Sequence, residues 1–218
     1  MASKILDANW HGYVDLGLPS GNLWAEYYVG AEKDIDLGLL FMWGIPKGFE
    51  TGKTTPISEL NWARSRQITE LNRTGSSYAT KLDIIKQNMG GSWVLPSHND
   101  FYELRRFLVF YGIRNNRAVF RSACNGRLIS FPLSGYADAT HVPMIGGTAY
   151  LWGAYNGGQF TTLAISRNGN ISISSYSGYC GQSIRGVLHA GKDFHVIRKG
   201  ITHRQYEERT SANKTFYS

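Results

Sequence analysis

The spacing of apolar residues changes along the chain from a helical period to a strand period. After Ser97, the residues Phe101, Leu104 and Leu108 recur at the spacing of one helix face. Ser97 is a suitable N-cap with Asp100 three residues on, and Gly112 is placed to end the helix. From residue 113 onward, apolar and polar residues alternate, which predicts strands. The pattern therefore places helices early and strands late.

Two further helices are predicted before residue 97. Thr55 and Pro56 form a typical helix start, followed by a loose apolar stripe through residues 57, 60, 68 and 71. A second, short helix is expected over residues 80–88.

Strands are predicted on both sides of the helices. Residues 13–25 form two apolar runs around a Pro-Ser-Gly-Asn turn, and residues 38–44 form a short apolar run between glycines. Later strands are expected at 128–133, 160–165 and 170–174, with a last core strand at 183–189. Asn168-Gly169 predicts a tight hairpin between 160–165 and 170–174, and Ile171 and Ile173 alternate with serines as in a half-buried strand.

Composition indicates one loop-rich globular domain. The 218 residues are 42% hydrophobic and include 25 glycines, whereas only 18% are charged. The aromatic residues (6 Trp, 13 Tyr and 10 Phe) dominate the apolar blocks, and a buried aromatic side chain removes about 150–250 Å² from water. The predicted core is Trp24, Trp43, Trp93, Phe101, Leu104, Phe131 and Trp152.

The net charge of +7 is spread along the chain. Residues 113–192 hold seven basic residues against one acid, Asp138. They do not cluster as in a nucleic-acid-binding arm, and no nucleic-acid motif is present. The arginines are expected on a solvated sheet face, with contact to an acidic protein surface or a glycan as the alternative.

Motifs for catalysis and cofactor binding are missing from the sequence. Gly48 and Gly52 precede Lys53 with three residues between the glycines, where a phosphate loop needs four. The six histidines form no metal-ligand motif, no Gly-x-Ser-x-Gly occurs, and Asp138 has no evident carboxylate partner. Cys124 and Cys180 are expected as buried thiols. We therefore predict no enzyme activity, no metal or other cofactor, and no membrane insertion.

Six blocks of the chain, in order, resemble the Fibrobacter succinogenes major paralogous domain family. Residues 13–25 (YVDLGLPSGNLWA) are similar to its VDLGLPSGTLWA block, and the helix at 101–104 follows as it does in that family. The other blocks are 38–44 (GLLFMWG), 90–97 (GGSWVLPS), 129–136 (ISFPLSGY), 149–155 (AYLWGAY) and 181–185 (GQSIR).

The resemblance implies a fold, but two functional motifs of related proteins are missing from this chain. It implies an α+β, C-type-lectin-like fold over residues 1–190, with two or three helices beside a small twisted antiparallel sheet and long glycine-rich loops. The scaffold is related to that of the formylglycine-generating enzyme, but the paired catalytic cysteines have no counterpart here. The Glu-Pro-Asn and Gln-Pro-Asp motifs of calcium-dependent sugar binding are also missing.

The family occurs in Bacteroidales bacteria and their phages, and because the first residues lack an apolar stretch we expect no secretory signal. We therefore expect a non-enzymatic virion protein, made in the host cytoplasm, that decorates the capsid or belongs to a fibre or tail. Its expected partners are other virion proteins or copies of itself. The alternatives are an adhesin for a host receptor or glycan, on a phage tail or bacterial surface, and a residual enzyme.

Two groups of residues are predicted to make contacts. Loops and strand faces in 153–182 combine tyrosine with small polar residues, as adaptable binding surfaces do, although Tyr176 and Tyr179 could simply cover the sheet. The candidate ligand- or partner-binding residues are Tyr155, Asn156, Gln159, Arg167, Ser174, Tyr176 and Tyr179.

The second group lies in a C-terminal arm, residues 191–218, which has no strand or helix period and a net charge of +3 from six basic and three acidic residues. The arm is expected to dock on a neighbouring chain with an acidic surface, or else to pack on its own domain. The candidate docking residues are Arg198, Lys199, Arg204, Phe216 and Tyr217.

Overall fold

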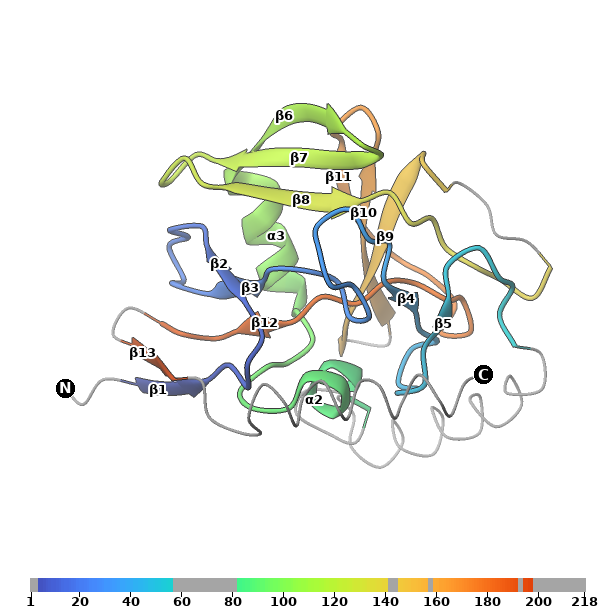
Figure 1. Cartoon of the computed structure of the whole chain (residues 1–218), viewed down its shortest axis with the longest axis horizontal. Coiled ribbons are helices and arrows are strands. Elements are labelled where there is room, and N and C mark those ends of the chain that lie inside the picture. Colours follow the sequence, from blue (N-terminus) through green and yellow to red (C-terminus); the bar gives the residue numbers. More distant parts are fainter. Residues whose placement is uncertain (1–3, 57–81, 141–144, 157–158, 192–193, 198–218) are drawn as a thin grey trace.

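The computed structural model describes residues 4–56, 82–140, 145–156, 159–191 and 194–197. Its strands form five small sheets that share one continuous body (Figure 1). The elements of the first half are β1 (Lys4–Asp7), β2 (Tyr13–Asp15), β3 (Leu23–Ala25), β4 (Leu39–Leu40), β5 (Phe49–Glu50), α2 (Ile84–Met89) and α3 (His98–Phe107). The second half contains β6 (Leu108–Arg114), β7 (Arg117–Ser122), β8 (Leu128–Pro132), β9 (Thr148–Asn156), β10 (Gln159–Ser166), β11 (Ile171–Ser175), β12 (Val187–Leu188) and β13 (Phe194–Ile197).

The predicted α+β, C-type-lectin-like fold is wrong. The described residues are 40% strand and 10% helix, with two helices and several small, mostly antiparallel sheets instead of one sheet flanked by helices. The helix predicted from Thr55 lies outside the described residues from position 57 on. The one predicted over 80–88 begins only at Ile84, after Asp83 as its N-cap.

The helix predicted after Ser97 is present but ends earlier than expected. Ser97 and Asp100 form the capping box, and α3 ends at Phe107. The apolar run from Leu108 continues as β6 because it pairs antiparallel with β7. Asn115 and Asn116 turn the chain with φ of +47° and +57°, and such left-handed pairs suit a tight hairpin. Gly112 therefore lies in an irregular part of a strand and does not cap the helix.

The predicted later strands are confirmed. β9, β10 and β11 form an antiparallel sheet in which Arg167-Asn168-Gly169 connects β10 to β11. Ile171 is buried and Ile173 half-buried, whereas Ser172 and Ser174 are exposed, as the alternation predicts. β8 matches the expected strand at 128–133, and β2 and β3 pair around the predicted turn.

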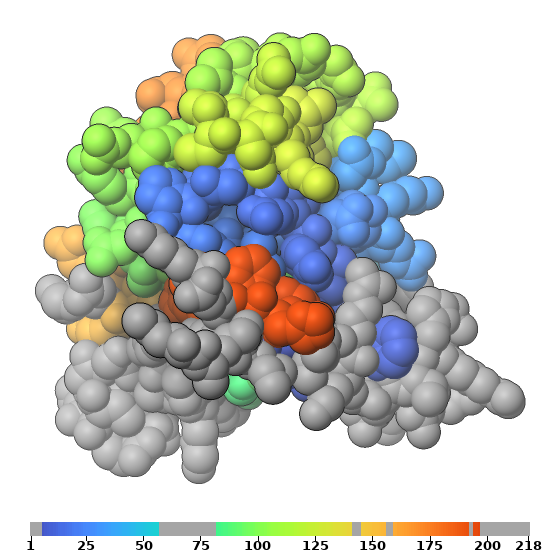
Figure 2. Space-filling view, turned by 90° about the vertical axis from the view of Figure 1, so that its left-hand side faces the viewer, coloured from blue at the N-terminus to red at the C-terminus, as the bar shows by residue number. Residues whose placement is uncertain are grey.

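The C-terminal part of the described chain returns to the N-terminal part. β12 adds to β3, and β13 pairs in parallel with β1 (Figure 1). In Figure 2 the orange-red residues from the C-terminal part accordingly lie next to blue residues from the N-terminal part. The expectation that no strand follows Gly191 is wrong for residues 194–197. These four residues belong to the folded body.

A buried segment at residues 181–188 bonds to many separate parts of the chain. It forms single bridges with Phe41, Val94, Ala137 and Leu151 and pairs with β3 through β12. All eight residues are buried. The predicted strand at 183–189 is therefore regular only at Val187–Leu188, since the preceding residues bond to several different neighbours. We call residues 181–188 the central segment.

The predicted core is confirmed. The seven residues named from sequence are all fully buried. Three of the indoles also bond to main-chain carbonyls: Trp43 donates to Gly153 (2.9 Å), Trp93 to Ala8 (2.8 Å) and Trp152 to Phe41 (2.7 Å). These three tryptophans thus join segments that are distant in sequence, both by packing and by a hydrogen bond.

Replacing Trp93 with Ala should lower the free energy of unfolding by about 3–5 kcal/mol, because the substitution leaves a cavity and removes one of the two hydrogen bonds that the Ala8 carbonyl accepts. Urea unfolding followed by circular dichroism measures this loss. Tyr102→Ala is the control, since its ring is exposed on α3. An unfolding midpoint for the Trp93 variant equal to that of the control would contradict the assignment of Trp93 to the core.

Candidate functional site

The residues predicted to form one binding surface lie at two ends of the β9–β10–β11 sheet. Tyr155 and Gln159 flank the connection between β9 and β10, and the Tyr176 main-chain N–H donates to the Phe160 carbonyl at the same end. Arg167 follows the other end of β10, about 25 Å away along an eight-residue strand. Its guanidinium donates to the Asn116 side chain (3.2 Å) and the Gly146 carbonyl (2.9 Å). Arg167 is therefore separate from the predicted tyrosines.

Tyr155 is largely a packing residue. Its ring lies 5.9 Å from that of Trp43 and 5.2 Å from that of Phe160, at the margin of the apolar core. Gln159 and Ser174 are exposed, and Tyr179 is half-buried in the turn after Tyr176. The Asn156 side chain lies outside the described residues, as do the five arm residues predicted to dock, so those predictions remain untested.

Tyr176 belongs to a cluster of three tyrosines. Its ring centroid lies 5.6 Å from that of Tyr136 and 5.4 Å from that of Tyr150, and Tyr136 and Tyr150 are 5.1 Å apart. Burial raises the pKa of Tyr176, and a hydrogen bond with Tyr150 adds to the effect. Burial also raises the pKa of Tyr136, so the phenols of Tyr136 and Tyr176 remain protonated hydrogen-bond donors at neutral pH.

The cluster continues onto a polar strand face. Tyr150, Ala164 and Ser172 lie directly across from one another on β9, β10 and β11, so Ser172 and Ser174 lie on the face that carries Tyr150. We call Tyr136, Tyr150, Ser172, Ser174 and Tyr176 the tyrosine surface. Sequence reasoning identified Tyr176 and Ser174 but missed Tyr136 and Tyr150, although both lie in the blocks quoted above. Only the pairing of distant strands brings them together.

A serine, an aspartate and a histidine also meet in the structure. Asp100 accepts from the Ser97 hydroxyl (2.7 Å) and lies 3.0 Å from His189 Nε2. The Asn22 amide donates to its other oxygen (2.8 Å). In a nucleophilic triad the serine would bond to the histidine. Here the Ser97 hydroxyl bonds to the carboxylate, so the group caps α3 and joins it to the segment after β12.

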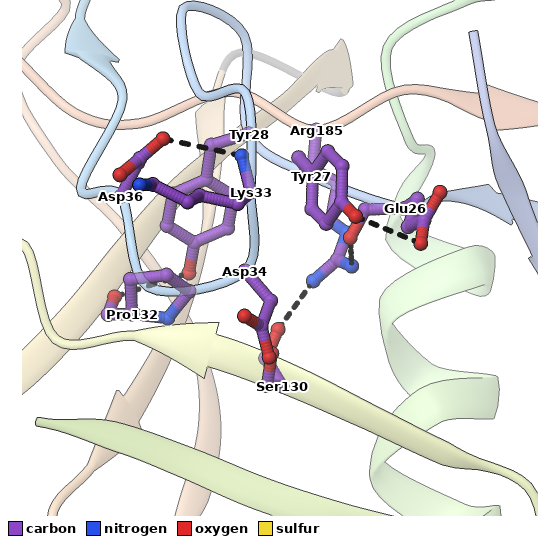
Figure 3. Close-up of a pocket in the computed structure, with 9 residues that line it drawn as sticks. All are labelled: Glu26, Tyr27, Tyr28, Lys33, Asp34, Asp36, Ser130, Pro132 and Arg185. Carbon is purple, nitrogen blue, oxygen red and sulfur yellow. Dashed lines mark hydrogen bonds between the residues drawn. The ribbon is translucent and has the colours of Figure 1, made fainter. Parts of the chain in front are cut away.

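The residues drawn in Figure 3 pack closely around the side chain of Arg185 and leave no room for a bound molecule. Arg185 is only 1% exposed. It donates to the carbonyls of Ala25 (2.7 Å), Ser130 (2.7 Å) and Glu26, and its charge lies over the rings of Tyr28 and Phe131. Desolvation lowers the pKa of Arg185 to about 10, so the side chain remains charged at neutral pH.

The structure corrects two expectations about polar side chains. Arg185 and Arg117 are buried and do not lie on a solvated sheet face; Arg117 forms an ion pair with Asp34. Cys124 is exposed and Cys180 half-buried, so the prediction of two buried thiols is wrong. Burial and the nearby Asp138 raise the pKa of Cys180, which favours its thiol form.

No protein-family model, curated protein or solved structure matches this chain. Neither helix in the described part of the chain has the length and apolar character that a membrane span requires. Within the described ranges, histidine, cysteine and acidic side chains form no group of three that could hold a metal ion.

The Asp100 cap makes a prediction about stability and pH. Burial alone would raise the pKa of Asp100, but the hydrogen bonds from His189 and Ser97 outweigh it and lower the pKa. Because the folded-state pKa lies below the unfolded value, ionised Asp100 stabilises the fold above about pH 4, and that contribution is lost as the pH falls further. The wild type should therefore be more stable than Asp100→Asn at pH 6, and the difference should shrink towards pH 3.

Urea unfolding at pH 6, 4.5 and 3 measures this difference. Burial raises the pKa of Asp83 to about 6, so Asp83 destabilises the fold as the pH rises through that range. Asp83 is present in both proteins, so its effect cancels in the comparison. A difference between the two proteins that stays constant from pH 6 to pH 3 would show that the Asp100 charge contributes nothing.

Proposed function

We propose that this chain is a non-enzymatic structural protein of a phage virion, located on the capsid surface or on a fibre or tail, and that it works by binding other proteins of the particle. The tyrosine surface is the observation that carries this proposal. Its three mutually packed rings lie beside exposed serines on a three-stranded sheet. Tyrosine offers a large contact area at a low cost in rotamer entropy, and serine adds adaptable hydrogen bonds.

Two further observations support the proposal. The six sequence blocks resemble a family found in Bacteroidales phages as well as in the bacteria. The tyrosine rings are also fixed by one another and by the sheet, so little order has to be created on binding. Docking of the arm through Arg198, Lys199, Arg204, Phe216 and Tyr217 is a separate prediction about assembly.

A second candidate function is adhesion to a host surface glycan or receptor, from a phage tail or a bacterial surface. The partial exposure of Tyr136 and Tyr176 favours it, because aromatic side chains beside the exposed hydroxyl groups of Ser172 and Ser174 are available for contact. The same surface would serve both functions, and the binding partner decides between them.

Changing the tyrosine surface should abolish binding while the domain stays folded. In the double variant Ser174→Arg and Tyr176→Ala, a bulky charge replaces an exposed serine and one ring of the cluster is lost. We expect at least a tenfold loss of co-sedimentation with purified phage particles, or with host cells if the second candidate is right. Tyr13→Ala, a half-exposed ring on β2, is the control.

Circular dichroism should show that the double variant melts as a folded protein. If that folded variant still binds particles and cells as the wild type does, the tyrosine surface is not the binding site. Loss of binding to cells alone would favour adhesion over a structural role in the particle.

A further inference from the structure

Strand β6 is an edge strand at one extremity of the molecule. Within the described residues, β7 is the only strand that pairs with β6, in a sheet of order β6-β7-β8. Figure 1 shows β6 as the uppermost strand, with its second edge facing outward. The main-chain groups along such an edge are available to pair with another extended chain.

The exposed side chains on β6 are unusually apolar for an edge strand. Val109 is 58% exposed, Tyr111 52% and Phe110 38%. Leu128 on β8 lies in the same cross-strand row as Val109, with Arg121 between them, and is also exposed. Burial of these side chains by a partner would add a hydrophobic contribution to main-chain pairing.

Arginines surround this edge, and acids are missing from its sequence. Residues 104–137 contain six arginines and no aspartate or glutamate. Arg117 is buried against Asp34, and the other five are exposed: Arg105, Arg106, Arg114, Arg121 and Arg127. The carboxylates just before this segment are already bonded, Asp100 to Ser97 and Glu103 to Ser20. The exposed arginines therefore give the edge a strong positive charge.

Two of these arginines lie over aromatic rings. The Arg114 guanidinium lies 5.3 Å from the Tyr111 ring centroid, and that of Arg106 lies 5.6 Å from the Phe107 ring. Such contacts hold the arginine side chains near β6 and leave their N–H groups able to bond to an incoming carboxylate. Arginine and tyrosine are also the residue types that contribute most to binding at protein interfaces.

We propose that an extended, acidic segment of a partner protein adds to the outer edge of β6 as a further strand. Its main chain would pair with β6, its apolar side chains would cover Val109 and Tyr111, and its carboxylates would meet Arg106 and Arg114. Strand addition of this kind obtains affinity from the main chain and selectivity from side chains. This site is on a different sheet from the tyrosine surface, which lies on the β9–β10–β11 sheet.

A second copy of the chain does not suit the edge. Antiparallel pairing of two β6 strands would bring Arg105 and Arg106 of one copy towards Arg114 of the other, since these residues flank the strand. Like charges in such positions destabilise pairing. The same arginines therefore reject a copy of this chain and favour an acidic segment.

The test uses the full chain and a fluorescein-labelled peptide of eight alternating Glu and Val residues. The controls are a Lys-Val peptide, the Glu-Val peptide N-methylated along both edges, and single-stranded dT10. Fluorescence anisotropy gives the affinities, and hydrogen exchange of the complex locates the protected amides. The binding variant is Arg106→Glu with Arg114→Glu. The charge control is Lys53→Glu, an exposed residue beside β5.

We expect the Glu-Val peptide to bind at least tenfold more tightly than both peptide controls and dT10. Double charge reversal should weaken it at least tenfold, and Lys53→Glu should change it less than twofold. Protection should appear in β6 but not in the serine-rich edge strand β11.

Several results would overturn the proposal. Equal binding of the N-methylated peptide would exclude strand pairing, and tighter binding of dT10 would indicate a nucleic-acid site instead. Protection outside β6 would place the site elsewhere. Sedimentation of the wild type as a dimer, together with loss of that dimer in the variant Arg106→Glu with Arg114→Glu, would show that β6 binds a second copy. The β6 proposal does not depend on whether changes to the tyrosine surface abolish binding to phage particles.

Discussion

A charged guanidinium lies in the interior of this protein, and the surrounding chain is arranged to satisfy it. Removing a cation from water costs several kcal/mol unless its N–H groups and its charge find partners. Arg185 donates to the carbonyl of Ala25 at the end of β3, to that of Glu26 just after it, and to that of Ser130 in β8. The rings of Tyr28 and Phe131 face its charge. The side chain thus joins the central segment to two separate sheets.

The central segment matters because the individual sheets are too small to be stable alone. Two- and three-stranded sheets need packing against other elements, and four of the sheets here have strands of only two to seven residues. Residues 181–188 pair with β3 and bridge to β9 and to three segments outside the strands, and three buried tryptophans also bond between distant segments. Stability therefore comes from contacts between sheets as much as from pairing within them.

Local signals in the sequence predicted local structure well. The Ser97–Asp100 capping box, the Asn168-Gly169 hairpin and the tryptophan core are each determined by a few neighbouring residues or by side-chain hydrophobicity, and all are present. The predicted end of α3 was wrong because Leu104 and Leu108 fit the apolar stripe of a helix. Pairing with β7, which is a non-local interaction, makes Leu108–Arg114 a strand instead. The fold class was wrong for a related reason: many short strands leave weak periodic signals.

Residue roles that depend on tertiary contacts were the hardest to predict. Arg185 looks like any other arginine in a basic stretch, and only the carbonyls of β3 and β8 show why it is buried. Tyr136, Tyr150 and Tyr176 come from three separate segments, so their cluster could not be identified from spacing. Arg167 is close in sequence to the predicted tyrosines, yet a strand length separates them. The two proposed binding sites lie on different sheets, the tyrosine surface on β9–β10–β11 and the outer edge of β6 on β6–β7–β8.

The most direct test of this account is the free energy of unfolding of Arg185→Met, measured in urea beside Arg121→Met, in which an exposed arginine is changed identically. Methionine removes the donor from three carbonyls, of which that of Ala25 is buried, and hydrogen bonds to a charged group contribute about 1.5–3 kcal/mol each. We predict a loss of at least about 3 kcal/mol for Arg185→Met, and a change within about 0.5 kcal/mol for Arg121→Met. Equal stability of the two variants would contradict the central role of Arg185.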